Sequence, residues 1–393
     1  MSLFEQAYRE KRLGHSDLQL RNAFIRAAAY EGMLVHGLPG QELFDHHVAM
    51  AKGCVALTTV SYGAVSADGR TFNTQMFIHD RSLEKLKVLA DKVHLAGGKV
   101  SMQLTHCGYF SKNRDNRHPL APSRVFNAYG FLSGIMFSRS MGRADMEKVA
   151  GDFAEAAFRL KEIGFDAVEI HMGHGYLLSQ FLSPRTNRRR DAYGGSIENR
   201  SRFPLEVLRA VVARVGKFFP VLVKLNLSDG FRNGFSLEEC KYVSQALEEQ
   251  GCTAIVLSGG FTSITPFYLM RGSVPLGGMI RNGTSIAEKI TMALLGPFII
   301  RRYRFTPNFF LDQAAEIRKV VKLPLVYLGG VESRRGMEEI LEAGFDFIAM
   351  ARALIHDPDF LTKLRERKIE QTECNRCNKC LVEMEREGVK CVL

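Results

Sequence analysis

The sequence has no tryptophan and no stretch that approaches the roughly 20 apolar residues needed to cross a bilayer. Its first residues, MSLFEQAYREKRLGH, are too polar for the apolar core of a secretory signal. Internal repeats and low-complexity linkers are also missing. We therefore expect a soluble protein with no membrane partner. The 46% content of hydrophobic residues is enough for a large buried core.

Cysteine is present, but it is not spread along the chain as a secreted disulfide framework would require. Four of the eight cysteines lie close together, at Cys374, Cys377, Cys380 and Cys391. This distribution favours a reducing compartment, and we expect the protein to be cytoplasmic.

Short apolar, β-branched segments alternate with amphipathic helical stretches along most of the chain. The predicted strands are residues 24–29, 55–60, 99–104, 167–171, 221–226, 254–258, 325–329 and 347–351. The predicted helices are residues 82–96, 145–163, 197–215, 236–249, 312–321 and 333–343. Eight such units predict the α/β class and a closed (β/α)8 TIM barrel. An open doubly wound sheet has similar strands, but its usual Gly-rich first turn is missing.

Two connections are long for loops between a strand and the next helix. They cover residues 107–144 and 259–311, and each follows a predicted strand. In a barrel, the loops after the strands build the active-site face. Both connections should therefore be lids or walls of a substrate pocket.

Three residues that can carry chemistry follow the fourth predicted strand: His171, His174 and Tyr176. Two imidazoles near a strand end can both donate hydrogen bonds to one oxygen and stabilise charge that develops there. A phenol with a pKa of about 10 stays protonated at pH 7 and can donate to a basic carbanion or enolate. Half of a metal site, or a structural pair of histidines, is the alternative, although no third ligand with zinc spacing follows.

The stretch from Gly164 to Phe203, GFDAVEIHMGHGYLLSQFLSPRTNRRRDAYGGSIENRSRF, resembles the signature of the old yellow enzyme family of FMN-dependent oxidoreductases. Further similarity lies at residues 25–33, 65–70, 103–108, 223–231 and 328–360, so the resemblance covers nearly the whole chain. It implies a (β/α)8 barrel with FMN at the carboxyl ends of the strands. We expect residues 1–370 to form this barrel and the cysteine-rich residues 371–393 to pack on it as a tail.

The resemblance also implies which residues contact the flavin. Gln103 is expected to hydrogen-bond the pyrimidine edge, and Lys224 to face N1 and the C2 carbonyl, where a cation stabilises the reduced form. Further cofactor contacts are implied at Ala28, Ala29 and Tyr62.

The phosphate of FMN is expected at the last two strands. Gly329 and Gly330 end the seventh predicted strand, and Ala351 and Arg352 end the eighth. Loops at these strands are the usual phosphate site of a barrel, where small residues admit backbone N–H groups and an arginine supplies charge. By themselves these residues would also fit a sugar-phosphate enzyme.

Two positions depart from the family pattern. Tyr30 stands where relatives carry Thr or Cys against the flavin C4 carbonyl, so tuning of the flavin is expected to differ there. Tyr109 stands where the pattern QLxHxGR has Arg, and we transfer no role to it.

The four clustered cysteines have the spacing C-x2-C-x2-C-x10-C. Larger members of the family bind a 4Fe–4S cluster near this point, with three residues before the third cysteine. Four thiolates can hold an iron–sulfur cluster or zinc, or can be free. Bound metal is the less favoured alternative because the spacing departs from that pattern.

The charge balance is basic, with 53 Lys and Arg against 42 Asp and Glu and a net charge of +11, which attracts anions. Basic runs lie at residues 188–190 and 301–304. The first belongs to the family signature, and the second has little of the aromatic interleaving that stacks bases. We expect solvated or dimer-facing surfaces, no nucleic-acid partner, and a possible homo-oligomer.

The resemblance and the residues together predict an ene-reductase. NADH or NADPH reduces FMN, and a small enone, an α,β-unsaturated carbonyl compound, then binds with its oxygen between His171 and His174. Flavin N5 delivers hydride to the β-carbon, and Tyr176 protonates the α-carbon. One alternative is a dehydrogenase or dienoyl reductase that passes electrons onward, through a cluster if the tail cysteines hold one. Another is a redox-silent barrel that binds phosphoryl ligands.

Overall fold

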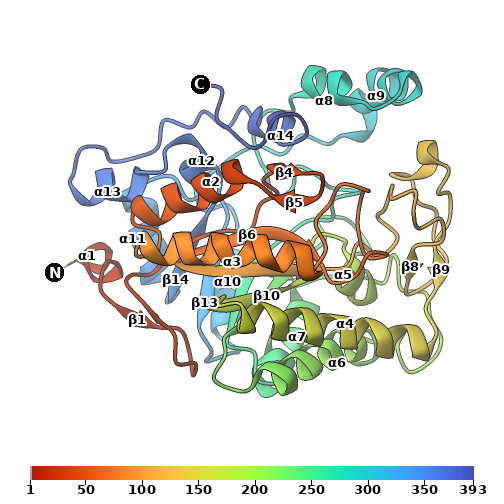
Figure 1. The fold of residues 1–393 in the computed structure, drawn as a ribbon, viewed down its shortest axis with the longest axis horizontal. Helices are drawn as coiled ribbons and strands as arrows, with labels where there is room; N and C mark the ends of the chain where they lie inside the picture. Colours follow the sequence, from red (N-terminus) through yellow and green to blue (C-terminus); the bar gives the residue numbers. More distant parts are fainter. Residues whose placement is uncertain (1) are drawn as a thin grey trace.

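Eight parallel strands form a closed barrel in the computed structural model, which describes residues 2–393 (Figure 1). The strands follow one another around the barrel in chain order, and the last pairs with the first. They are β3 (Phe24–Arg26), β6 (Leu57–Ala64), β7 (Lys99–Thr105), β10 (Ala167–Met172), β11 (Val221–Asn226), β12 (Ala254–Ser258), β13 (Leu325–Leu328) and β14 (Phe347–Met350). The TIM barrel predicted from the sequence is confirmed.

Apart from Lys99 at the start of β7, the barrel strands are buried along their whole length, because helices cover the outside of the barrel and side chains fill the inside. In β10, Val168 and Ile170 alternate with Glu169 and His171. A barrel strand with this alternation places its apolar residues under the helices and its polar residues inside the barrel. Glu169 and His171 therefore point into the interior of the barrel.

Six helices agree with the sequence prediction to within a few residues. They are α3 (Asp80–Leu95), α4 (Arg143–Glu162), α6 (Ile197–Val215), α7 (Leu237–Glu249), α10 (Leu311–Arg318) and α11 (Arg334–Glu342). Local signals define some of their ends. At the start of α7, the Ser236 hydroxyl accepts from the backbone N–H of Glu239, whose carboxylate accepts from the backbone N–H of Ser236.

The sequence prediction missed other helices. They are α1 (Leu3–Ala7), α2 (Gln41–Lys52), α5 (Leu177–Leu182), α12 (Arg352–His356), α13 (Phe360–Arg365) and α14 (Cys380–Glu383). Most are too short to show a helical period in the sequence. Among the described residues, no helix is long and apolar enough to cross a membrane.

The first and second predicted strands also needed correction. The first ends at Arg26 instead of residue 29, and the second is shifted to Leu57–Ala64. Residues 27–29 leave the sheet and enter the rim of the cavity described below.

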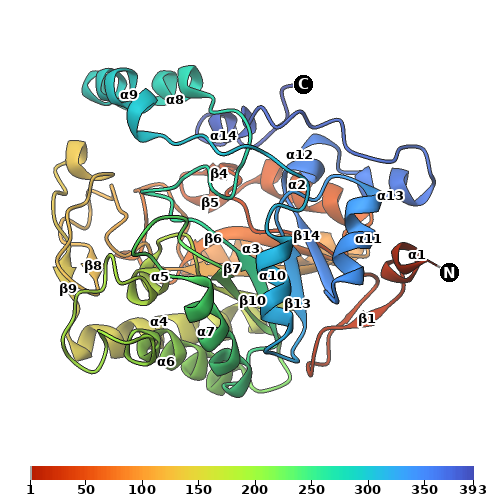
Figure 2. The ribbon, with the colours of Figure 1, turned by 180° about the vertical axis from the view of Figure 1, so that it is seen from behind.

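The two long connections contain small elements of their own. The first holds β8 (Leu120–Ala121), a 3-10 turn (Phe131–Ser133) and β9 (Arg139–Ser140), and the second holds α8 (Leu276–Asn282) and α9 (Ile286–Ile299). Both lie on one side of the barrel, where Figures 1 and 2 show α8 and α9 next to the yellow segment that leads to β9. Two-stranded sheets elsewhere pair β1 (Lys11–Arg12) with β2 (Gln19–Leu20) and β4 (Leu34–Val35) with β5 (Leu38–Pro39).

A buried ion pair links β3 to the segment that follows it, and its hydrogen bonds reach β6. Arg26 Nη1 lies 2.6 Å from Glu31 Oε1, and both side chains are almost fully buried. Arg26 also donates to the carbonyl oxygens of Thr59 and Ala29, while the Glu31 carboxylate accepts from the backbone N–H of Ser61. These bonds hold Ala29 and Ser61 in place.

Replacing Glu31 with Ala leaves a buried guanidinium unpaired, so we expect the free energy of unfolding to fall by about 3–5 kcal/mol. Urea denaturation followed by circular dichroism measures the change. The matched control is Glu155→Ala, which removes an exposed partner of Arg214 at 3.0 Å and should cost about 0–1 kcal/mol. Equal effects of the two substitutions would show that the buried pair is not needed.

Candidate active site

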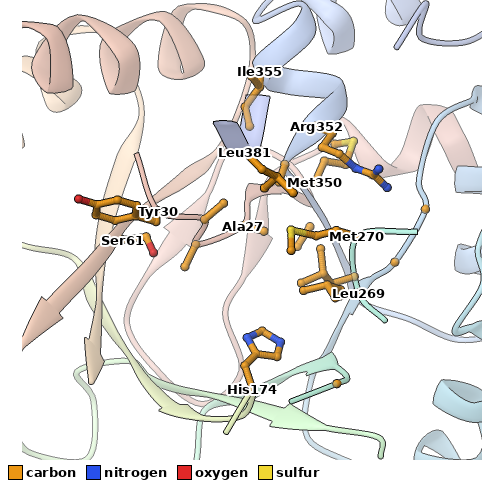
Figure 3. Close-up of a pocket in the computed structure, with 18 of the residues that line it drawn as sticks. Ala27, Tyr30, Ser61, His174, Leu269, Met270, Met350, Arg352, Ile355 and Leu381 are labelled. Atoms are coloured by element: carbon orange, nitrogen blue, oxygen red, sulfur yellow. The ribbon is translucent and has the colours of Figure 1, made fainter. Parts of the chain in front are cut away.

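A cavity of about 270 Å³ opens at the carboxyl ends of the barrel strands, close to the lower end of the size range of ligand pockets, about 300 Å³ (Figure 3). Small side chains from three strand ends let ligand atoms approach the backbone. The predicted cofactor contacts that line the cavity are Ala28, Ala29, Tyr62, Gln103, Gly329, Gly330, Ala351 and Arg352. His171, His174 and Tyr176 line it too, so the fold brings these residues to one place.

The two histidines lie side by side, with ring centroids 4.9 Å apart. The backbone N–H of Gly173 donates to His171 Nδ1 at 3.3 Å, so the proton of the neutral ring belongs on Nε2. His174 has a positive φ of 59°, held by a hydrogen bond from its N–H to Asn226 Oδ1 at 3.1 Å, and its Nε2 lies 2.8 Å from Ser258 Oγ. The His171 ring is therefore held by the turn that follows β10, and the His174 ring contacts Ser258 at the end of β12.

Both imidazoles are neutral at pH 7. Burial, aided by the charge of Lys224, lowers the pKa of His174 to about 3 and holds the pKa of His171 well below its usual value. A neutral imidazole offers one N–H donor without a full charge. The pair can therefore polarise a bound oxygen without requiring a counter-ion.

Tyr176 stands beside this pair as the residue that precedes α5. Its ring centroid is 4.8 Å from that of His171 and 5.4 Å from that of Tyr62. Burial raises the pKa of Tyr176, while a hydrogen bond from Tyr62 lowers it in part. The phenol stays protonated at neutral pH.

Glu169 is a residue that the sequence analysis missed. Its Oε1 lies 2.9 Å from Lys224 Nζ and accepts from Gln103 Nε2 at 2.7 Å. Lys224 is fully buried and also donates to the carbonyl oxygen of Ala28 at 3.4 Å. Although Gln103 borders the cavity, Lys224 is not in its lining. The alternation of Glu169 with His171 along one strand was the signal that could have identified it.

The opposite end of the cavity is cationic. Arg352 Nη1 donates to the carbonyl oxygen of Arg271 at 2.9 Å and to Asn378 Oδ1 at 2.8 Å. Arg376, which the sequence analysis did not select, also lines the cavity and forms two hydrogen bonds of 2.7 Å with Glu332. Two guanidinium groups therefore face the same end.

Position 330 requires glycine because a side chain there would collide with a neighbouring residue, as well as hinder the approach of a ligand. It has a φ of +77°, and a Cβ atom there would lie 2.7 Å from Phe309 Cδ1. A larger residue would displace Phe309.

The two tyrosines that depart from the family pattern lie in different places. Tyr30 lines the cavity, 5.5 Å from Tyr62 between ring centroids. Tyr109 is buried, and its hydroxyl lies 2.8 Å from Ser263 Oγ. Tyr109 thus joins the first long connection to the second.

The four tail cysteines form no disulfide and line one small second cavity. Cys391 Sγ lies 3.2 Å from His356 Nδ1, and burial raises the pKa of Cys380 to about 11. Cys374 and Cys380 also line the main cavity. Among residues 2–393, no group of three or more His, Cys, Asp or Glu side chains is arranged to hold a metal ion.

The donors around the main cavity fit FMN. An isoalloxazine ring needs an apolar slot with an amide and hydrogen-bond donors near its polar edge, and a phosphate needs cations and small residues. Figure 3 shows His174 and Arg352 on opposite sides of the cavity, which Gln103, His171 and Arg376 also line. The chemistry at the two ends matches the two halves of FMN.

Comparison with known proteins agrees with the fold and the site. Residues 13–260 match the model of the NADH:flavin oxidoreductase / NADH oxidase family. The chain is 36% identical over 396 residues to 4,4'-dithiodibutanoate disulfide reductase from Rhodococcus erythropolis, covering 100% of this chain and 95% of that protein. It is 31% identical over 386 residues to NADH oxidase from Thermoanaerobacter brockii, covering 97% of this chain but only 53% of that relative.

Among solved structures, the old yellow enzyme homologue from Zymomonas mobilis superposes with a TM-score of 0.70 at 21% identity, with 94% of each chain covered. The fold and the cavity thus define an oxidoreductase barrel of the flavin type. The chain belongs to the NADH:flavin oxidoreductase / NADH oxidase family, whose members use FMN with NADH or NADPH. The resemblance to the old yellow enzyme family is confirmed, and a redox-silent phosphoryl-binding barrel is set aside.

The lowered pKa of His174 should make stability depend on pH. The unfolded chain binds a proton below about pH 6.5, but the folded protein does so only near pH 3, so stability is lost as the pH falls through this window. Between pH 6.5 and 5 this histidine should cost about 2 kcal/mol. Urea denaturation at both pH values measures the loss.

His174→Gln should remove this part of the pH dependence, whereas His118→Gln, at an exposed loop position, should leave it intact. An unchanged slope in His174→Gln would mean that the imidazole already protonates near its usual pKa.

Proposed function

We propose that this protein transfers a hydride from NADH or NADPH, by way of FMN, to the β-carbon of an α,β-unsaturated carbonyl compound. The observation that carries the proposal is the meeting of two neutral imidazoles, His171 and His174, with the protonated phenol of Tyr176 on one cavity wall. The family assignment supplies the flavin chemistry. The two imidazoles and the phenol are the reason for proposing an unsaturated carbonyl compound as the hydride acceptor.

FMN, when bound, supplies a hydride at N5. Gln103 would bind the pyrimidine edge, and the ammonium of Lys224, shared with Glu169, would favour negative charge on the ring. The residues that would hold the rest of the cofactor are Ala28, Ala29, Tyr62, Gly329, Gly330, Ala351 and Arg352.

The histidines would bind the carbonyl oxygen of the substrate. His171 donates from Nε2, because Nδ1 already accepts from Gly173. His174, with its ring centroid 4.9 Å from that of His171, would add the second N–H donor. Two N–H donors on one oxygen withdraw electron density from the double bond and favour hydride addition at the β-carbon.

Tyr176 would complete the reduction. Hydride addition leaves an enolate, whose α-carbon takes a proton from the phenol hydroxyl and gives the saturated carbonyl compound. The hydrogen bond from Tyr62 stabilises the phenolate that remains, until a proton from solvent restores it.

A second substrate class is favoured by the 36% identity over the full chain to a disulfide reductase. Hydride addition to one sulfur would break the S–S bond, release one thiol, and leave a thiolate that takes its proton from Tyr176. The same residues therefore serve either acceptor. Enone and disulfide substrates are distinguished by assaying both with the same enzyme preparation.

The tail cysteines bear on the dehydrogenase alternative, in which electrons pass onward through a 4Fe–4S cluster. Cys374, Cys377, Cys380 and Cys391 share one small cavity, which supports a common role. Their spacing departs from that of larger family members, so we propose that they are free thiols in a reducing cytoplasm. Homo-oligomer formation stays a prediction of the sequence.

Replacing Tyr176 with Phe should slow reoxidation of the reduced enzyme by 2-cyclohexenone by about 10²–10⁴-fold, because the proton donor is lost. Reduction by NADPH should be unchanged. Anaerobic stopped-flow absorbance measures the two half reactions separately. Tyr109→Phe is the control, since that hydroxyl contacts Ser263 outside the cavity lining. Undiminished enone turnover in Tyr176→Phe would remove this residue from the mechanism.

Elemental analysis of anaerobically purified protein tests whether the four tail cysteines bind a metal. We expect no stoichiometric iron or zinc, and the activity with 2-cyclohexenone should survive treatment with a chelator. Four iron atoms per chain, lost on Cys377→Ala but kept on Cys54→Ala, would instead favour the dehydrogenase with a cluster.

A further inference from the structure

Helix α9 exposes apolar side chains over most of its surface. Ile286, Leu294 and Phe298 are 78%, 65% and 87% exposed, and Ile290, Leu295 and Ile299 are exposed as well. Its main contact is with α8, on the side where Gly296 is buried. At 100° per residue, the exposed apolar positions extend over more than half of the helix circumference. A helix that is apolar on most sides requires an apolar environment.

A second group of exposed apolar residues lies in the first long connection. Its members are Phe126, Phe131, Leu132, Met136 and Phe137. Phe126 holds the group together, with ring centroids 5.6 Å from Phe131 and 5.7 Å from Phe137. Figures 1 and 2 both show this yellow segment next to α9, and Lys112 acts electrostatically on Glu288 of α9. The two groups therefore lie near one another, and we call them together the apolar face.

Exposed cations border the apolar face. Near α9 they are Arg281, Lys289, Arg301, Arg302 and Arg304, and near residues 126–137 they are Arg114, Arg117 and Arg124. Only Glu288 and Asp115 carry negative charge within residues 276–304 and 112–126. The border of the face is therefore strongly basic, within a chain of net charge +11.

We propose that the apolar face docks on the surface of a bilayer that contains anionic phospholipids. Apolar side chains beside a basic border match the two layers of such a surface, acyl chains and negative headgroups. A second copy of the chain would cover one stripe of α9, whereas acyl chains at a bilayer surface can contact a wider part of the circumference that α8 leaves free. The 14 residues of α9 span about 21 Å, less than a bilayer core of about 30 Å, so the helix lies in the surface.

The sequence predicted no membrane partner, because it contains no segment long enough to cross a bilayer. Surface docking needs no such segment. The observation that carries it is the exposure of α9, which only the folded chain reveals.

Phe298→Trp provides a direct test on the FMN-loaded protein, because the chain has no other tryptophan. We expect its emission to shift to shorter wavelength with vesicles of phosphatidylcholine and phosphatidylglycerol, and the wild-type protein to float with these vesicles in a density gradient. Vesicles of phosphatidylcholine alone should bind much less, and added salt should weaken binding.

The double variant Ile290→Glu/Leu294→Glu should lower the bound fraction by about tenfold or more. Leu95→Glu is the matched control: Leu95 is 89% exposed at the end of α3, outside the apolar face, and the variant should bind like wild type. Flavin content and NADPH oxidation should be unchanged in both variants, which shows that they are folded.

Wild-type protein that stays unbound with anionic vesicles would overturn the proposal, as would equal binding by the double variant. A dimer that becomes a monomer on Ile290→Glu/Leu294→Glu, without vesicle binding by wild type, would assign the apolar face to a second copy instead. Size-exclusion chromatography with light scattering separates these outcomes.

Discussion

The site depends on one buried carboxylate. Glu169 contacts both Lys224 and Gln103, which come from the strands on either side of β10. A lysine inside a barrel is costly without such a partner, so the pairing makes a cation possible next to the cavity. The parallel register places Glu169 opposite Gln103 and His171 opposite Lys224. A slip of one residue would turn these side chains out of the barrel.

The same cation helps to set the chemistry of the histidines. Burial and the charge of Lys224 both lower the pKa values of His171 and His174, so the pair donates hydrogen bonds as neutral groups. Tyr176 is held protonated by burial. At this end of the cavity, charge is thus kept in the layer of Lys224 and Glu169 inside the barrel, and His171, His174 and Tyr176 on the wall are neutral donors. This division suits a reaction in which negative charge develops on the substrate.

The tail completes the other end of the cavity. Arg376, Cys374 and Cys380 come from the tail and lie with Arg352 around the same space. The backbone N–H of Val389 donates to the carbonyl oxygen of Glu31, so the tail is also tied to the segment after β3. The residues that would bind an anion there therefore include a residue of the tail, Arg376. The second long connection contributes Met270 and Leu269 to the cavity and α9 to the apolar face.

The sequence by itself determined the barrel, because buried parallel strands require continuous apolar runs and each run is separated by an amphipathic helix. It also determined the histidine pair and Tyr176, which lie within a few residues of each other at one strand end. Glu169, Arg376 and the exposure of α9 were decided only by the tertiary structure. The sequence alone does not distinguish these features, because carboxylates within apolar runs, arginines near a chain end and apolar helices are all common. Their roles depend on which strands become neighbours and on which apolar surface the fold leaves exposed to solvent.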